Sequence, residues 1–298
     1  MKKIIAVVAV LLVLIVLVGA VILVPPHIQI RGIEPAPPSL AEIQKLRIVE
    51  HGPVKIGAIE TSSQQSKNRV SGNTVFVIEW EDGRMFMVDA AMDKPAAVDF
   101  AKQMELLGAT APLDYRESVV QALGDKIKNI QGVGFTHLHI DHTQGVKEFC
   151  ERRGTGAKVY QTATQATVHN LHTEEGAQLV RDSCLEPVVV EGEGITQLKE
   201  FPGLAMLNVG GHTPGSTVFF VTVGDKLWVL SGDVSNNKKA LLDNKGKGFL
   251  YSYLIVPENT RQLEKLRVWL ASLDAQKDIE VIVSHDADAL AKSEIPKM

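Results

Sequence analysis

The chain has little cysteine and no excess of basic charge, and each shortage argues against a class of protein. Its 298 residues include only Cys150 and Cys184, too few for a disulfide-rich scaffold. Neither belongs to a Cys-x-x-Cys pair, so a cysteine-based zinc site has no support. The two could pair outside the cytosol, but we favour the alternative that each is a small buried apolar residue. A formal charge of −4 gives no footprint for nucleic acid, which we do not expect as a partner.

One long uncharged run stands at the N-terminus. Lys2 and Lys3 precede an apolar stretch, residues 4–24, that ends at Pro25 and Pro26. These 21 residues suffice to cross a hydrocarbon core of ~30 Å at ~1.5 Å per residue, whereas a cleaved signal usually has ~7–15 apolar residues. We therefore predict that residues 1–25 are a membrane anchor, with a signal sequence as the alternative. The leading lysines place the rest of the chain outside the cytoplasm (periplasmic or extracellular), or secreted if the segment is cleaved.

The remainder divides into a short linker and one large domain. Prolines bracket residues 26–39, which we predict to be a stiff linker, and we expect the domain to occupy residues 40–298. Strand-like and helix-like runs alternate through both halves of this domain, which predicts layered α/β packing. Strands are expected at 74–80, 84–88, 133–136, 158–161, 186–190, 205–209, 217–223, 226–230 and 280–283, and helices at 96–107, 115–123, 143–153, 165–181 and 261–273.

Histidines and carboxylates gather in one segment that indicates a metal site. The chain reads Thr-His-Leu-His-Ile-Asp-His over residues 136–142, although it has only nine histidines in all. His, Asp and Glu are the side chains that hold a hydrolytic metal such as zinc, and alternate residues of an extended segment project to one side. Four more sites each follow a strand-like run: Asp89, His212 in Gly-His-Thr-Pro-Gly-Ser, Asp233 in Ser-Gly-Asp, and His285 in Ser-His-Asp.

The order His-x-His-x-Asp-His, Gly-His-Thr-Pro-Gly-Ser, Ser-Gly-Asp, Ser-His-Asp resembles that of the metallo-β-lactamase superfamily, from about Leu40 to the C-terminus. The resemblance implies an αββα sandwich: two mixed β-sheets flanked by helices. It also implies the ligand sets of two metal ions. One ion would be held by His137, His139 and His212; the other by Asp141, His142 and His285. Asp233 would bridge both ions, and Asp89 would support the site from behind the ligands.

The chemistry of such a site follows from its ligand types. Two divalent ions ~3.5–4 Å apart can share one water, lower its pKa and present a hydroxide to a carbonyl or phosphorus. A carboxylate such as Asp141 or Asp233 can accept or relay the proton. Oxygen and imidazole ligands without thiolate suit Zn²⁺, which we favour, and also Mn²⁺ or Fe²⁺.

The resemblance also bears on the substrate. Several zinc β-lactamases have Cys near position 233, whereas Asp233 places the chain nearer the lactonase, glyoxalase II and phosphodiesterase branch. Residues 257–266, before Ser284-His285-Asp286, are similar to the corresponding segment of acyl-homoserine lactonases. We therefore predict a dinuclear hydrolase that opens a small ester, with a lactone favoured. The alternatives are a β-lactam or thioester hydrolase and, from another class, a catalytically inert metal-binding scaffold.

Several further side chains have two interpretations. Tyr251 or Tyr253 could hydrogen-bond a substrate carbonyl, or both could be packing aromatics on a half-buried strand. Four lysines could attract an anionic substrate, although a solvated loop is favoured: Lys238, Lys239, Lys245 and Lys247. His169 and His172 match no ligand motif and are predicted to lie at the surface or behind the ligands. The sequence gives no oligomeric state.

Overall fold

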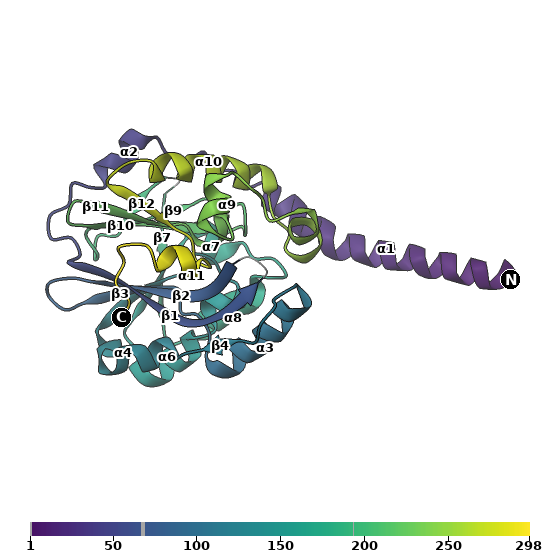
Figure 1. Cartoon of the computed structure of the whole chain (residues 1–298), viewed down its shortest axis with the longest axis horizontal. Coiled ribbons are helices and arrows are strands. Elements are labelled where there is room, and N and C mark those ends of the chain that lie inside the picture. The colour runs from purple at the N-terminus through teal and green to yellow at the C-terminus, as the bar shows by residue number, and fades with distance from the viewer. Residues whose placement is uncertain (1, 67–68, 193) are drawn as a thin grey trace.

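Two β-sheets lie face to face in the computed structural model, which describes residues 2–66, 69–192 and 194–298, and helices cover both outer faces (Figure 1). The strands are β1 (Lys55–Ser66), β2 (Arg69–Glu79), β3 (Met85–Val88), β4 (Asp114–Tyr115), β5 (Ile130–Gly134), β6 (Lys158–Thr162), β7 (Glu186–Val190), β8 (Thr196–Gln197), β9 (Leu204–Asn208), β10 (Thr217–Val223), β11 (Lys226–Leu230) and β12 (Ile279–Ile282).

The helices are α1 (Lys2–Arg31), α2 (Leu40–Lys45), α3 (Lys94–Leu106), α4 (Val119–Leu123), α5 (Ile140–Thr143), α6 (Val146–Arg153), α7 (Ala163–Thr167), α8 (Glu174–Arg181), α9 (Lys238–Leu242), α10 (Thr260–Asp274) and α11 (Ala287–Leu290), with shorter turns η1 (Gly124–Asn129), η2 (Gly232–Val234) and η3 (Tyr251–Ile255). One sheet has the order β4-β1-β2-β3-β5-β6-β7 and the other β12-β11-β10-β9-β8. Parallel pairs among β3, β5, β6 and β7, and between β11 and β12, make both sheets mixed. The predicted αββα sandwich is confirmed.

Central strands are apolar on both faces because each face is covered. In β2, Phe76 and Ile78 belong to the core between the sheets, whereas Val75 and Val77 pack toward the helices outside. The alternation follows from the two-residue period of a strand, and burial on both sides turns the pattern into a continuous apolar run. Such runs are the signal from which the central strands were predicted.

The two cysteines form a disulfide, so the prediction that they are separate buried residues is wrong. Cys150 near the end of α6 and Cys184 beyond α8 have Cα atoms 5.6 Å apart. The reason is tertiary: α6 and α8 lie next to each other on the outside of the seven-stranded sheet, although 34 positions separate the cysteines. Sequence spacing alone contained no sign of that contact.

Removing this disulfide is expected to destabilise the domain. For a loop of this length the loss of chain constraint corresponds to about 3–4 kcal/mol, or roughly 10 °C in Tm for a domain of this size. The Tm of the Cys150→Ser, Cys184→Ser double variant, measured by calorimetry, should be lower than that of the wild type by this amount. A reductant should lower the Tm of the wild type to the same extent. Equal Tm values for the double variant and the wild type would show that the disulfide adds no stability.

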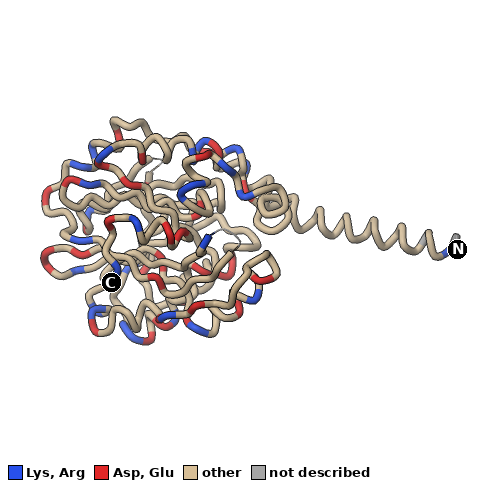
Figure 2. Tube along the Cα trace, viewed as in Figure 1, with Lys and Arg blue, Asp and Glu red and all other residues tan. Residues whose placement is uncertain are grey.

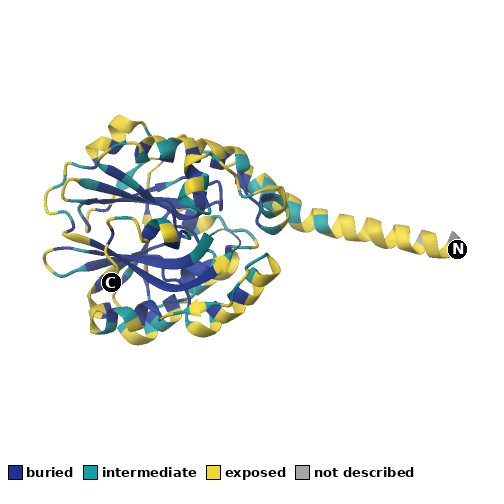
Figure 3. Ribbon diagram, in the orientation of Figure 1, coloured by how far each residue is buried: buried dark blue, intermediate teal, exposed yellow. Residues whose placement is uncertain are grey.

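The N-terminal helix is longer than the sequence predicted. It passes through Pro25 and Pro26 and ends at Arg31, and most of its length is exposed and apolar (Figure 3). Proline supplies a helical φ but no N–H, so two backbone hydrogen bonds are missing there. Contacts of the last turn with the domain offset that loss, since Ile30 is fully buried and Gln29 Nε2 donates to a carbonyl 3.0 Å away.

The predicted linker, residues 26–39, therefore starts as helix and then packs on the domain. Carbonyls of Pro35 and Pro38 accept hydrogen bonds from Gln262 and Trp269 of α10. A capping box between Ser39 and Glu42 starts α2 at Leu40, the position predicted for the first domain residue.

One strand was missed, and two predicted helices were wrong in part. The 12-residue strand β1 was missed because its second half is polar, although it lies between two other strands. The helix predicted over 165–181 is two helices, because Asn170 and Thr173 bond to the backbone between them. Residues 115–123 begin with the end of β4 and become helical at Val119.

Candidate metal centre

Loops at one edge of the two sheets bring the predicted ligands together. His137 and His139 follow β5, and the next residues turn into α5, which carries Asp141 and His142. His212, Asp233 and His285 follow β9, β11 and β12 of the other sheet. At Gly232 the backbone has φ +56°, and a Cβ there would lie 2.8 Å from the Cβ of Thr136. Glycine thus permits the close approach that delivers Asp233 to the opposite sheet.

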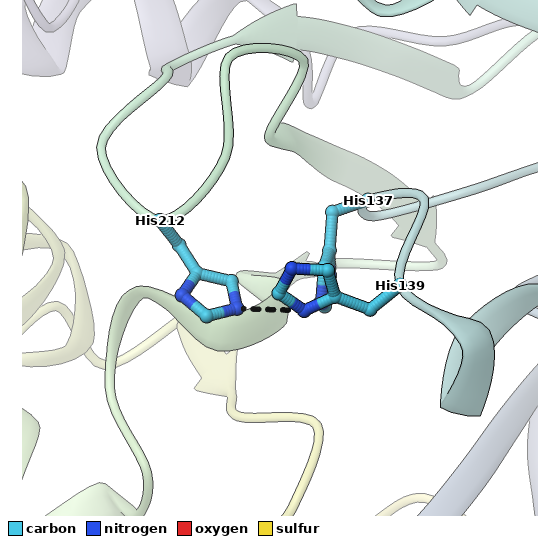
Figure 4. Close-up of side chains that lie close together, drawn as sticks. All are labelled: His137, His139 and His212. Carbon is cyan, nitrogen blue, oxygen red and sulfur yellow. Dashed lines mark hydrogen bonds between the residues drawn. The ribbon is translucent and has the colours of Figure 1, made fainter. Parts of the chain in front are cut away.

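Three imidazoles form the first group. Nδ1 of His139 lies 3.1 Å from Nε2 of His137 and 3.3 Å from Nε2 of His212, and all three rings converge (Figure 4). Burial is the main cause that holds the pKa of His137 and of His139 well below the usual value. The rings are therefore neutral at physiological pH, which is the form that binds metal.

The second group combines imidazoles with carboxylates. Nε2 of His285 lies 3.2 Å from Nε2 of His142, 3.3 Å from Oδ2 of Asp141 and 3.2 Å from Oδ1 of Asp233. Burial opposes ionisation of Asp141, but the neighbouring histidines outweigh it and lower its pKa. Burial likewise lowers the pKa of His285, yet Asp233 and Asp141 raise it well above the usual value. The group places two ionised carboxylates beside imidazole nitrogens, a set of donor atoms suited to a divalent cation.

Asp233 lies between the two groups and faces each with a different oxygen. Oδ2 is 3.6 Å from Nε2 of His212, and Oδ1 is 3.9 Å from Nε2 of His142. Within the described residues, buried Oδ1 accepts no well-aligned hydrogen bond, although Nε2 of His285 lies 3.2 Å away, so this oxygen is available to a cation. Three sets of ligand atoms here lie within 4.8 Å of one another: His137, His139, His212; His137, Asp141, His142; and His142, Asp233, His285. The donor set fits divalent metal ions.

Asp89 orients the second group from behind. Its carboxylate accepts hydrogen bonds from the backbone N–H of Thr136 (2.7 Å) and its hydroxyl, and Oδ2 lies 2.9 Å from Nδ1 of His142. Such a contact fixes which nitrogen of the imidazole is free to bind metal. The residue has φ +64°, a strained conformation that is held where it serves the site.

Sequence reasoning missed a buried ion pair behind His212. Oε1 of Glu258 lies 2.6 Å from Nδ1 of His212 and 3.1 Å from Nζ of Lys247, and Ser252 donates to Oε2 at 2.6 Å. Burial opposes ionisation of Glu258, but Lys247 and His212 lower its pKa to about 2. Glu258 is the first charged residue after the uncharged stretch 248–257, which is the one signal that the sequence offered.

Lys247 is buried, so the prediction of a solvated loop is wrong for it. Its Nζ lies 3.6 Å from Oδ2 of Asp233, and Glu258 and Asp233 raise its pKa against the effect of burial. The other three lysines lie away from the ligands: Lys238 bonds to Asp274 and Val281, Lys239 pairs with Asp243, and Lys245 is exposed.

Neutralising Glu258 is expected to weaken metal binding. Glu258→Gln keeps the shape but loses the charge that stabilises the Nδ1–H of His212 and pairs with Lys247. The expected loss is about 10–100-fold in metal affinity, measured by competition with a chelating dye. Glu264→Gln, on the exposed face of α10, is the matched control. Equal metal affinity in both variants would show that Glu258 does not contribute to metal binding.

A cavity of about 310 Å³ opens over the ligands. Tyr251 is in its wall, and burial is the main cause that raises the pKa of this phenol to about 12, so it keeps its proton. Tyr253 lies outside the cavity with its ring stacked on His27, and we withdraw it as a candidate. Both tyrosines lie in η3, so the predicted half-buried strand is wrong.

His172 lines the cavity with its ring centroid 6.2 Å from that of His139, whereas His169 caps the end of α7 through the carbonyl of Ala166.

The family model of the metallo-beta-lactamase superfamily matches residues 68–284. No curated protein matches the sequence. Among solved structures, an N-acyl homoserine lactone hydrolase with the product N-hexanoyl-L-homoserine at its catalytic metal centre is similar, with a TM-score of 0.58, 15% identity, and coverage of 82% of this chain and 98% of that chain.

Two further hydrolase structures have the same fold. A probable metal-dependent hydrolase from Staphylococcus aureus gives a TM-score of 0.56 at 14% identity, covering 80% of this chain and 91% of its own. The hydrolase AbOPH, described as a member of the beta lactamase superfamily, gives 0.54 at 14%, covering 77% and 86%. At these identities the likeness shows the fold alone.

Proposed function

We propose that this chain, which belongs to the metallo-β-lactamase superfamily, is a membrane-anchored hydrolase that uses two divalent metal ions to open a small ester, with a lactone favoured. The observation that carries the proposal is the position of Asp233, whose two oxygens face two separate groups of imidazoles. His137, His139 and His212 would hold one ion, and Asp141, His142 and His285 the other. Zn²⁺ is the favoured ion, with Mn²⁺ and Fe²⁺ as alternatives.

The bound ions would supply Lewis acidity and lower the pKa of a water molecule. Side chains of the protein would relay protons and position the substrate. Asp141 and Asp233 stay ionised, since their pKa values are lowered, so they carry the charge that divalent ions require, and either could relay a proton without keeping it. Tyr251 keeps its proton, and a neutral phenol in the cavity wall can donate a hydrogen bond to the oxygen of a substrate carbonyl as negative charge develops there.

The cavity supports a small substrate with an apolar part. Its lining includes four candidate ligands, His139, Asp141, Asp233 and His285, and an apolar wall of Phe100, Met104, Leu107 and Leu113. A volume near 310 Å³ is at the lower end of the range for small-molecule sites. A lactone ring at the carboxylates with a short acyl chain along that wall matches both features. The lactone hydrolase of similar fold is consistent with this choice.

A substrate panel tests the proposal. The full-length chain in detergent, loaded with Zn²⁺, is assayed on an acyl lactone, a thioester, a phosphodiester and a β-lactam. We expect the highest kcat/KM on the lactone and loss of that activity in Tyr251→Phe by about tenfold or more. A higher kcat/KM on the thioester or the β-lactam would show that the proposed substrate class is wrong, while the proposed metal-dependent hydrolysis would stand. No turnover of any of the four substrates would favour an inert scaffold.

The proposed location rests on α1 and on the disulfide. By length and composition α1 can cross a membrane, and Lys2 and Lys3 favour an orientation with the domain outside the cytoplasm. Disulfides persist in oxidising compartments, so the bond between Cys150 and Cys184 supports the same side. Alkaline carbonate should leave the full-length protein in the membrane fraction; release into the supernatant would contradict an uncleaved anchor.

A further inference from the structure

The base of α1 is held firmly against the domain beside the cavity. Nε2 of His27 bonds to the carbonyl of Tyr253 at 3.0 Å, and the two rings stack with centroids 5.4 Å apart. On the other side, Gln29 donates to the carbonyl of His169. Figure 1 shows the segment around η3 beside the base of α1, before α1 leaves the body of the molecule. The direction of α1 thus fixes which face of the domain is presented to a membrane.

Large apolar side chains are exposed around this base. They are Ile28 (66% exposed), Leu171 (64%), Phe249 (69%), Leu250 (67%) and Leu254 (52%), and we call them the apolar collar. No charged residue occurs from Gly248 to Pro257, so this stretch of the tube beside the base of α1 is tan in Figure 2, with charged residues next to it. Exposed apolar clusters of this kind on a soluble face are unfavourable in water and mark a binding surface.

The collar lies at the depth of the lipid headgroups if α1 crosses the bilayer. The uncharged span ends at Val24, and Ile28 follows in the same helix four residues later, about 6 Å further along the axis. The headgroup layer on each side of the hydrocarbon core is roughly 5–8 Å thick. An apolar surface at that depth is covered by lipid, not water, which is the arrangement of interfacial anchors.

The collar and the cavity share a wall. Tyr251 and Ile255 line the cavity, whereas their neighbours Leu250 and Leu254 point out to the collar. Leu107 also lines the cavity and is 48% exposed. A chain that leaves the lipid at η3 would therefore meet apolar side chains on the outer side of η3 and again in the cavity wall.

We propose that the apolar collar docks into the headgroup layer of the bilayer that α1 crosses, so that the cavity takes amphiphilic esters, with an acyl chain, directly from the membrane. The docking part rests on the proposed anchoring, and the substrate part rests on the proposed hydrolase activity. The occupant of the collar is phospholipid. The collar continues the apolar surface of α1 without a gap, which is the reason to choose lipid over a second copy of the chain.

Tryptophan quenching tests the docking without any assay of activity. The full-length chain is reconstituted into vesicles of phosphatidylcholine brominated on the acyl chains, carrying Leu250→Trp, Leu14→Trp in the span, or Ile48→Trp, which is 85% exposed and outside the collar. After subtraction of the wild-type signal, Leu250→Trp should be quenched at least about twofold more than Ile48→Trp, and tenfold dilution with lipid should not change this.

The three positions separate the possible failures. If Leu14→Trp is quenched and Leu250→Trp behaves as Ile48→Trp, the anchor stands and the docking is refuted, as it would be if a second copy covered the collar. If Leu14→Trp is not quenched either, the anchoring itself fails.

Kinetics in the same vesicles test the entry of substrate. The double variant Leu250→Glu, Leu254→Glu should raise KM for a long-chain acyl lactone about tenfold while leaving kcat/KM for a short, water-soluble lactone unchanged. An equal change for both lactones, or none for either, would refute entry from the membrane. Absence of lactone turnover in the wild type would refute the hydrolase proposal instead, and the quenching result would remain.

Discussion

Asp233→Ala should lose at least about 10³-fold in kcat/KM, equivalent to roughly 4 kcal/mol of transition-state stabilisation. The expected effect is large because one side chain faces both groups of imidazoles: Oδ2 lies toward His212 and Oδ1 toward His142 and His285. Its loss would remove a ligand from each proposed metal position and would also leave the buried ammonium of Lys247 with Glu258 as its remaining carboxylate partner. His139→Ala should give a loss of similar size.

Folding of the variant must be shown separately. Far-ultraviolet circular dichroism should be unchanged, since Asp233 lies in the short turn η2 after β11 and belongs to none of the apolar core clusters. Asp243→Ala, which removes an exposed carboxylate paired with Lys239, is the matched control and should keep full activity. Full activity in Asp233→Ala would exclude this carboxylate from the mechanism.

Removal of metal should both abolish turnover and destabilise the fold. Without a cation, the ionised carboxylates of Asp141 and Asp233 are buried among imidazole nitrogens 3.1–3.3 Å apart. A ligand present at about 1,000 times its Kd adds about 4 kcal/mol of stability, which for a domain of this size corresponds to roughly 10 °C in Tm. Dialysis against a strong chelator should lower Tm by at least that amount.

Reconstitution is the control for that experiment. Zn²⁺, Mn²⁺ and Fe²⁺ added separately to the chelated protein should each restore Tm to some degree, and the ion that restores turnover identifies the working metal. An unchanged Tm and unchanged turnover after chelation would contradict a metal centre of any kind.

The parts of the fold that the sequence predicted are those with a local pattern. Strands β2, β10 and β11 are apolar runs of strand length, and α10 has apolar residues at helical spacing. The candidate metal ligands were recognisable because they follow such strands, so their convergence at one edge needed only the sheet order implied by the resemblance. The structure places all seven of them around one centre.

The parts that failed depend on contacts between distant segments. The partner of Cys150 is 34 residues away, and β1 is a strand because of its neighbours and not because of its own polar second half. Lys247 lies in a sequence rich in glycine and lysine that is typical of a solvated loop, yet Glu258 and Asp233 hold it inside. The helix α1 continues past two prolines because the domain binds its last turn.

Metal content per chain tests the central claim most directly. The full-length protein, purified without chelator and dialysed free of loose ions, is measured by inductively coupled plasma mass spectrometry against the protein concentration from amino-acid analysis. The arrangement of the seven side chains predicts two divalent ions per chain, falling to one or none in Asp233→Ala. A wild-type value of one or none, unchanged after incubation with excess Zn²⁺, would contradict it.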